Sequence, residues 1–359
     1  MRIIQLIDSL EAGGAERMAV SYANALSKKI EFSGLIATRK QGPLVNLIEK
    51  EVAYFFLNRK STLDIASLFR LRSYIKNNNI TIVQAHSSSF FLAFLLKLVY
   101  PRVQLIWHDH YGNSEFLSKR PTRVLRILIP FFSGVLVVNH NLKDWCKQRL
   151  KIANIIFLPN FVGCENKTPS ETILKGIAGK RIVCLANLRS QKNHYFLIEV
   201  AEKLKISHPD WTFHLVGKDF LDDYSREIKA LIVASNLEKK VFLYGSKQDV
   251  GNIIDQASIC ILTSKSEGLP VSLLEYGLHK KPVIVTNVGD VSTVIQKNVN
   301  GFLVESDQIE VFYDSIVKLI ANDKLQIDFG LALYKTIVEN YREESVIKIY
   351  INWLQNSCK

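Results

Sequence analysis

Two glutamates with seven residues between them are the most informative chemical feature of the chain. Glu267 and Glu275 flank a glycine–leucine–proline turn, 268–270, that follows the apolar run 259–262. A buried strand that enters a helix through a glycine turn presents several free backbone N–H groups at one point, which attracts phosphate. The carboxylates on either side can accept hydrogen bonds from sugar hydroxyls. A nucleotide-sugar site needs this combination of a phosphate cradle and hydroxyl acceptors.

The same glutamates also have a structural explanation. Pro270 suits the first turn of a helix, which places Glu267 just before that helix and Glu275 roughly one and a half turns inside it. Acidic residues are favoured near a helix N-terminus whatever the function. That preference accounts for Glu267 but less well for Glu275, so we expect both side chains to reach into one crevice.

Two cations follow a candidate strand at 182–185. Arg189 and Lys192 stand three residues apart, at the expected mouth of a second sheet. Cations in this position can neutralise a departing pyrophosphate by electrostatic stabilisation of the transition state. A solvated charged loop is the structural alternative.

A glycine pair, Gly13 and Gly14, follows the first candidate strand, 3–7. Glycines at a strand-to-helix turn let the backbone approach a ligand closely. The pair matches neither the dinucleotide-binding Gly-x-Gly-x-x-Gly pattern nor a P-loop. Alone it is a weak signal, and a tight turn is the alternative.

Three histidines lie near the ends of two further candidate strands, 80–84 and 104–107. A histidine at a strand end can hydrogen-bond a sugar hydroxyl, and His108 is the first candidate for that role. Metal binding is a weaker alternative, because we expect His108 and His110 to point in opposite directions along an extended segment and not to share an ion. His86 is more simply explained as a packed or solvated side chain.

Apolar, β-rich runs alternate with amphipathic helical stretches along the whole chain. The candidate strands are, in order, 3–7, 34–37, 53–57, 80–84, 104–107, 135–138, 182–185, 212–216, 240–244, 259–262, 282–285 and 301–304. Continuous apolar strands indicate burial on both faces, and the alternation predicts parallel sheets. We predict an α/β protein with two facing Rossmann-like, doubly wound domains. The first covers 1–165 and is joined by a C-terminal helix at about 342–359, and the second covers 170–341.

The composition fits two such domains. The chain has 359 residues, 48% of them hydrophobic, and its five cysteines are scattered, which is typical of a reducing compartment. Its net charge of +12 comes without zinc-finger spacing, an RNA-recognition signature or a long basic run, so we expect no nucleic-acid partner. No apolar run is long or clean enough to span a bilayer, and the first residues are typical of a strand rather than a signal peptide. We expect a cytoplasmic protein.

Segment 118–132 is basic and apolar together, as a helix on a membrane surface would be. It predicts peripheral association with an anionic membrane, on the inner face of the plasma membrane. The alternative is a core helix with a basic outer face.

With these motifs in place, the chain resembles glycosyltransferase family 4, a large retaining group with two Rossmann-like domains of the GT-B type. The resemblance covers nearly the whole length, and the motifs follow the family's order. They are Gly13-Gly14-Ala15-Glu16, the His108 loop, Leu158-Pro159-Asn160, Lys192, Gly217, 242–245 and Glu267-x7-Glu275. The last motif is quite specific. Each of the others is a weak signal alone, but their occurrence together in the family's order is a strong one.

The resemblance implies roles for particular residues. The catalytic residues would be His108, beside the reacting carbon, and Glu267, on the donor sugar. The donor-binding residues would be Gly13, Gly14, Arg189, Lys192, Gly268, Leu269, Pro270 and Glu275. Among these, Glu275 would bind the ribose and Lys192 the diphosphate. The family often has Gly-Arg-Leu before the lysine, whereas this chain has Ala186-Asn187-Leu188, so its arginine is displaced by two residues.

The family's mechanism implies that the acceptor hydroxyl attacks from the face the diphosphate leaves, without an accepted enzyme nucleophile. Sugar transferases of the other common architecture usually hold a cation with an Asp-x-Asp cluster, which this sequence lacks. Asp222 and Asp223 are adjacent, and capping of a helix explains them. We therefore expect no cofactor and no metal.

The motifs predict a nucleotide-sugar donor, and the resemblance implies that its sugar is transferred with retention to a glycan or lipid-linked acceptor. The product would be a cell-surface polysaccharide such as capsule, O-antigen or lipopolysaccharide. A sugar-nucleotide epimerase, which would need no acceptor, is one alternative. A donor-binding partner subunit without catalysis is another, although the presence of His108, Lys192, Glu267 and Glu275 together argues against it.

Overall fold

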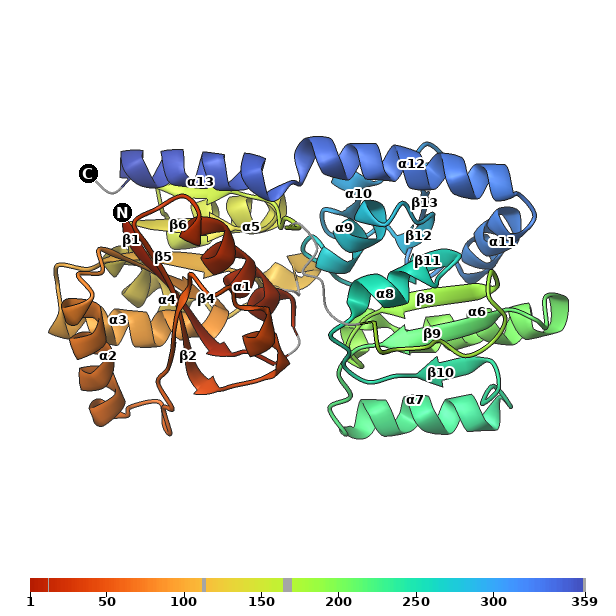
Figure 1. Cartoon of the computed structure of the whole chain (residues 1–359), viewed down its shortest axis with the longest axis horizontal. Coiled ribbons are helices and arrows are strands. Elements are labelled where there is room, and N and C mark those ends of the chain that lie inside the picture. The colour runs from red at the N-terminus through yellow and green to blue at the C-terminus, as the bar shows by residue number, and fades with distance from the viewer. Residues whose placement is uncertain (12, 112–113, 164–169, 358–359) are drawn as a thin grey trace. The chain divides into compact units, whose positions relative to one another are not determined.

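The computed structural model describes residues 1–11, 13–111, 114–163 and 170–357. The chain divides into two compact units. Unit 1 comprises Met1–Cys164 and Arg342–Lys359, and unit 2 comprises Glu165–Tyr341. Each unit is a parallel β-sheet with helices packed on it (Figure 1).

Within its described residues, unit 1 has a seven-stranded sheet in the order β3-β2-β1-β4-β5-β6-β7, with every neighbouring pair parallel. The strands are β1 Arg2–Ser9, β2 Phe32–Lys40, β3 Ala53–Phe56, β4 Ile82–His86, β5 Gln104–Asp109, β6 Gly134–Val137 and β7 Ile155–Phe157. The order reverses between β1 and β4. Ligands of doubly wound sheets bind beyond the carboxyl ends of the strands at such a switch point.

The main helices of unit 1 fill the connections between these strands. They are α1 Gly14–Ser27, α2 Ile65–Asn77, α3 Phe90–Val99, α4 Arg123–Leu128 and α5 His140–Trp145. A further helix, α13 Glu343–Ser357, follows unit 2 in the sequence but packs in unit 1 against α1 (Figure 1). Its Trp353 indole N–H donates to the Asn154 side-chain oxygen at 2.9 Å. The predicted return of the C-terminal helix to the first domain is confirmed.

Unit 2 repeats the pattern, with a six-stranded parallel sheet in the order β10-β9-β8-β11-β12-β13 across the residues described. The strands are β8 Arg181–Leu185, β9 Thr212–Val216, β10 Val241–Leu243, β11 Ile259–Leu262, β12 Val283–Thr286 and β13 Phe302–Val304. The helices are α6 His194–Ser207, α7 Asp223–Ala234, α8 Val250–Asp255, α9 Val271–Leu278, α10 Val291–Val294, α11 Ile309–Ile320 and α12 Asp323–Asn340. The predicted fold class, two doubly wound parallel sheets, is confirmed.

The predicted strands agree with the observed bounds to within three residues, and two differences from the prediction have a clear physical cause. The strand expected at 80–84 lies at Ile82–His86, because the Ile80 N–H donates to the Ile75 carbonyl at 3.0 Å and so closes α2 instead of starting β4. The three-residue edge strand β7 was not predicted, because such a short apolar run carries no periodicity. Across the described part of the chain, no helix combines the length and the apolar character needed to cross a membrane.

Candidate active site

A buried ion pair forms the centre of the candidate site in unit 2. After β8, a single 3₁₀ turn, Ser190–Lys192, is followed by Asn193. Asn193 has a φ of 54° and is the N-cap residue of α6. The Lys192 ammonium donates to the Glu267 carboxylate, and the two side chains are 18% and 7% exposed. Two residues predicted separately are thereby joined. A charge-assisted bond between largely buried groups fixes both side chains more firmly than a surface pair would.

The surrounding loops hold this pair in place. The Ser264 hydroxyl donates to Glu267 at 2.7 Å, and the Thr263 hydroxyl donates to the Lys192 carbonyl at 3.0 Å. The Thr286 hydroxyl donates in turn to the Ser264 carbonyl at 2.7 Å. The loops that follow β8, β11 and β12 are therefore linked, as expected where parallel strands end at one edge of a sheet.

Helix α9 follows directly from this loop. It starts at Val271, so Pro270 is its N-cap residue and lies one position earlier than the predicted first turn. Glu275 is the fifth residue of the helix and is half-buried. The Gly268 carbonyl accepts a hydrogen bond from the Asp290 N–H at 2.9 Å.

The rest of the turn packs tightly against the loop after β12. Leu269 is buried. Gly289 has a φ of +58°, and an added Cβ there would overlap the Glu267 carbonyl. Position 289 therefore needs glycine, which adopts a positive φ readily and has no Cβ.

Arg189 is placed differently from Lys192. Its side chain is exposed, and the guanidinium lies over the Phe220 ring, 4.5 Å from the centroid. The Lys218 ammonium lies 5.1 Å from the same centroid. Arg189 therefore lies beside Lys218 and Phe220, which belong to the loop after β9.

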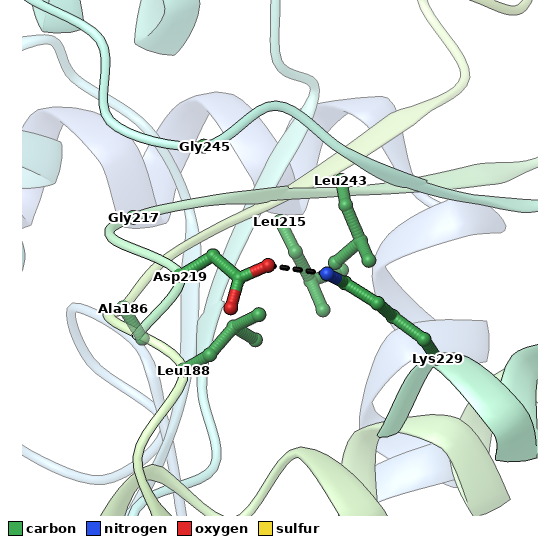
Figure 2. A pocket seen from close by; sticks show the side chains of 8 residues that line it. All are labelled: Ala186, Leu188, Leu215, Gly217, Asp219, Lys229, Leu243 and Gly245. Atoms are coloured by element: carbon green, nitrogen blue, oxygen red, sulfur yellow. Dashed lines mark hydrogen bonds and ion pairs between the residues drawn. The ribbon is translucent and has the colours of Figure 1, made fainter. Parts of the chain in front are cut away.

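A pocket of about 230 Å³ opens at the carboxyl ends of β8, β9 and β10 (Figure 2). Its lining is Ala186, Leu188, Leu215, Gly217, Asp219, Lys229, Leu243 and Gly245. Apolar side chains form one part of the wall, and an ion pair between Lys229 and Asp219 forms another. A Cβ at Gly217 would overlap the Ala186 carbonyl, so glycine there lets two loops close together.

In unit 1, the glycine pair lies where the sequence predicted, at the start of α1. Gly13 is the N-cap residue, with an extended φ of −169°, and its carbonyl accepts from the Arg17 N–H at 2.9 Å. A Cβ at Gly13 would meet the Glu16 carboxylate, whereas one at Gly14 would have no atom of the described residues within 4 Å. Packing inside unit 1 therefore does not require glycine at position 14.

The expectation that His108 and His110 point apart is wrong. Residues two apart on a strand share a face, and the two ring centroids lie 3.8 Å apart. His86, opposite His108 in the register of β4 and β5, has its ring centroid 4.9 Å from that of His108. All three histidines therefore form one group.

His86 and His108 are buried, and His110 is partly exposed. Burial lowers the pKa of His86 and of His108 well below the usual value, and it lowers the pKa of His110 to about 3. His108 is 1% exposed and its Nδ1 is 2.9 Å from the Gln84 side-chain nitrogen. The Tyr350 hydroxyl of α13 donates to the other end of Gln84. Gln84 and Tyr350 were not predicted, since they meet His108 only through tertiary packing.

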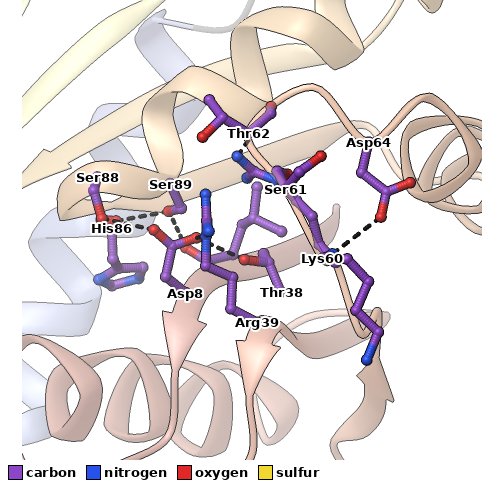
Figure 3. A network of polar contacts seen from close by, with 12 residues as sticks. Asp8, Thr38, Arg39, Lys60, Ser61, Thr62, Asp64, His86, Ser88 and Ser89 are labelled. Carbon is purple, nitrogen blue, oxygen red and sulfur yellow. Dashed lines mark hydrogen bonds and ion pairs between the residues drawn. The ribbon is translucent and has the colours of Figure 1, made fainter.

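A second polar network lies beside these histidines, at the ends of β1, β2 and β4 (Figure 3). The Asp8 carboxylate accepts hydrogen bonds from the hydroxyls of Thr38 at 2.6 Å and Ser88 at 2.7 Å. Arg39 lies 4.0 Å from the same carboxylate. Asp8 was not among the predicted site residues, although a carboxylate directly after the candidate strand 3–7 is a detectable signal.

Two family models match the chain, and between them they span most of its length. The model described as "Glycosyltransferase Family 4" matches residues 12–166, and the one described as "Glycosyl transferases group 1" matches residues 174–336.

Relatives and solved structures agree with these matches. An "Uncharacterized glycosyltransferase" of Haemophilus influenzae is 26% identical, covering 94% of this chain and 95% of its own. The Escherichia coli UDP-Gal:alpha-D-GlcNAc-diphosphoundecaprenol alpha-1,3-galactosyltransferase is 24% identical, covering 98% and 97%. The structure of a mutant of S. aureus TarM with Fondaparinux, alpha-GlcNAc-glycerol and UDP superimposes with a TM-score of 0.81 at 16% identity, covering 98% and 99%, and this likeness shows the fold alone. The chain belongs to glycosyltransferase family 4 and has the GT-B fold.

Proposed function

We propose that this glycosyltransferase transfers a sugar, with retention of configuration, from a nucleotide-diphosphate sugar to a glycan or lipid-linked acceptor of a cell-surface polysaccharide. The observation that carries the proposal is the buried Lys192–Glu267 pair at the carboxyl edge of the unit 2 sheet, beside the N-terminus of α9. The name of the E. coli relative gives UDP-Gal and an acceptor linked to diphosphoundecaprenol. This supports both the proposed donor class and the proposed acceptor class.

The ion pair has a clear use in such a reaction. Without a donor, Glu267 neutralises Lys192. When a diphosphate arrives, Lys192 exchanges the carboxylate for a phosphate oxygen, and Glu267 becomes free to accept hydrogen bonds from the sugar. Backbone N–H groups at the start of α9 add positive potential at the same place. Glu275, farther along α9, is proposed to bind the ribose.

The pocket of Figure 2 is proposed to receive the nucleoside. It lies along the same sheet edge as Lys192, and its wall is largely apolar, which suits the face of a base. Gly217 has no side chain, so the loops after β8 and β9 can approach each other closely at that wall. The UDP in the TarM complex supports a nucleoside diphosphate as the ligand class.

The chemical step follows from this arrangement. The bond between the anomeric carbon and the phosphate oxygen breaks as the acceptor oxygen forms a new bond on the same face of the sugar. The acceptor's proton passes to the departing phosphate oxygen. Lys192 and the α9 N-terminus stabilise the negative charge that develops on the nucleotide, so this step requires no metal ion.

The roles proposed for unit 1 need one refinement. His108 was the histidine predicted to contact the sugar, yet its Nε2 is fully buried. His110 is partly exposed just beyond the end of β5. His110 is therefore the better placed of the two to hydrogen-bond a substrate, with His108 behind it. Gly13 and Gly14 keep their proposed role in donor binding.

A lipid-linked acceptor would bring the enzyme to a membrane, and one face of unit 1 suits that partner. On α4, Val124 is 57% exposed and Ile127 is 68% exposed, and Phe131, just beyond, is 39% exposed. Within 118–132, Lys119, Arg123 and Arg126 are exposed, and the segment has no acidic residue. Exposed apolar side chains on a basic surface are typical of binding to anionic lipid. We propose peripheral association through 118–132, on the cytoplasmic side.

The function is tested by thermal-shift measurements with nucleoside diphosphates and their sugars, followed by product analysis with the best donor. A ligand at about 100 times its dissociation constant should stabilise the protein by about 2.7 kcal/mol. Transfer to an added acceptor with the anomeric configuration retained supports the proposal. Conversion of the donor to an epimer without an acceptor would establish the epimerase instead, and no binding at millimolar concentration would refute both.

Vesicle flotation tests the membrane face. Wild-type protein should float with anionic vesicles and not with neutral ones, and a double variant, Val124→Glu with Ile127→Glu, should lose flotation. The matched control carries Ile206→Glu and Val233→Glu, at residues that are 83% and 59% exposed in unit 2. Equal flotation of the two double variants would contradict this assignment.

A further inference from the structure

The histidine group of unit 1 has the arrangement of a metal-ligand set. His86 ends β4, His108 lies in β5, and His110 follows directly after it. One ring nitrogen from each lies within 4.8 Å of the other two. His86 Nδ1 and His110 Nε2 are 3.0 Å apart. Two nitrogens on a tetrahedral Zn²⁺, with bonds of 2.0–2.1 Å, are separated by about 3.3 Å, so these two are already close to that spacing.

The other ring nitrogens of the two buried histidines are held from outside the group. His86 Nε2 donates to the Gln5 side-chain oxygen at 2.7 Å, and His108 Nδ1 contacts the Gln84 amide at 2.9 Å. Metal-binding histidines are almost always oriented in this way, by a hydrogen bond to the nitrogen that does not bind the ion. With an ion on His108 Nε2, the proton lies on Nδ1 and Gln84 turns its amide to present oxygen. The Tyr350 hydroxyl can then accept from the Gln84 nitrogen.

Unpaired polar atoms mark the same place. Among the described residues, His108 Nε2 is buried and has no hydrogen-bond partner, and the same holds for the Tyr22 hydroxyl and the Gln5 side-chain nitrogen. The Tyr22 ring lies 5.3 Å from that of His108, centroid to centroid. An unpaired buried polar atom costs about 1–3 kcal/mol, so a group of them calls for an explanation, such as a bound ion or water.

The histidine group is also accessible to an ion. His110 is partly exposed, which gives an ion a route in from solvent. Three histidines with an open fourth position form a known zinc coordination set.

We propose that His86 Nδ1, His108 Nε2 and His110 Nε2 bind one divalent transition-metal ion of the Zn²⁺ or Co²⁺ class, with water as the fourth ligand. The site is in unit 1, and the step proposed at the diphosphate in unit 2 does not use its ion. Because the ion binds His110 through Nε2, the Nδ1 of His110 is left for the substrate contact proposed above. Its ligands come from two strands that the sheet places side by side, which is why the sequence spacing alone does not reveal it.

Cobalt titration tests the proposal on the full chain with any purification tag removed. Co²⁺ in a tetrahedral site absorbs visible light, so the wild-type protein should develop a band that saturates at one ion per chain and disappears when Zn²⁺ is added. His110→Gln should weaken Co²⁺ binding at least about tenfold. This partly exposed residue is chosen because its replacement should leave the fold intact, which circular dichroism checks.

The matched control is His140→Gln, at an exposed histidine of the same unit. This variant should bind Co²⁺ as the wild type does. His86→Gln and His108→Gln should also lose binding, provided that they fold. The proposal is overturned if wild-type protein shows no saturable Co²⁺ band below about 1 mM, or if His110→Gln binds as tightly as wild type. Water alone would then occupy the group.

Discussion

The two units hold their candidate residues in opposite ways. In unit 2, Lys192 and Glu267 stand on loops beyond the strands and depend on neighbouring loops of the same sheet edge. In unit 1, His108 lies inside the sheet core, and its support reaches through Gln84 to Tyr350, 266 residues farther along the chain. We infer that substitution of Lys192 or Glu267 in unit 2 should reduce activity more than it reduces stability. Loss of a buried unit 1 residue should first reduce stability.

The largest expected effect is that of Lys192→Ala. Removal of the cation that stabilises the departing nucleotide should lower kcat about 10²–10³-fold, as the loss of one preorganised electrostatic group does elsewhere. The unfolding free energy should fall less than it would on loss of a fully buried group, because Lys192 is 18% exposed and Glu267 keeps its bond to Ser264. Kinetics and thermal unfolding of this variant, beside Lys265→Ala at an exposed neighbour, test this contrast between the units directly. An unchanged turnover number would remove the proposed role of Lys192.

Gly217→Ala tests the unit 2 pocket. The new Cβ would overlap the Ala186 carbonyl, which forces two loops apart and should cost about 1–3 kcal/mol of stability or nucleotide affinity. Thermal shifts with UDP measure both. Gly251→Ala is the control, because this glycine lies in α8 outside the pocket and its new Cβ would meet only the His279 side chain, at 3.1 Å. If the two variants bind UDP equally well, the pocket of Figure 2 does not hold the nucleoside.

Unit 2 also contains a buried histidine, which makes its stability depend on pH. Burial, with the charge of Lys192, lowers the pKa of His194 to about 4. The neutral form is favoured in the folded state, so its contribution is complete above pH 6.5, the unfolded value, and falls as the pH drops towards 4. From pH 6.5 to 5 the loss is about 1.6 kcal/mol. Urea unfolding of His194→Gln should show a profile flatter than wild type by this amount, and parallel profiles would contradict the assignment.

Tyr350→Phe gives the smallest predicted effect, and it tests the unit 1 side of the contrast. The variant removes the hydroxyl that donates to buried Gln84, which should cost about 1–2 kcal/mol. Tyr313→Phe is the control, because its hydroxyl bonds to Ser207 at an exposed site and should matter less. Urea unfolding compares the two. Equal stability would mean that the buried network contributes little to unit 1.

The sequence predicted what depends on local pattern. Continuous apolar strands alternating with helices indicated both sheets, and the Glu-x7-Glu segment led to the loop before α9. The Lys192–Glu267 pair joins residues 75 apart, so each was predicted but their contact was not. Gln84, a polar residue inside a buried strand, has its partners on β5 and α13, which no local signal identifies. The prediction that His108 and His110 point apart is wrong for another reason. Residues two apart on a strand share a face, so strand geometry alone places both rings on one side.

The position of α13 has a consequence for synthesis of the protein on the ribosome. All of unit 2 is translated before the helix that completes unit 1, so the earlier unit in the sequence is finished later. At 5–20 residues per second, the 199 residues from Asn154 to Trp353 take about 10–40 s to make. During that interval the surface that α13 will cover is open to chaperones and to other nascent chains. Any shortening that removes Tyr350 and Trp353 would make that temporary exposure permanent.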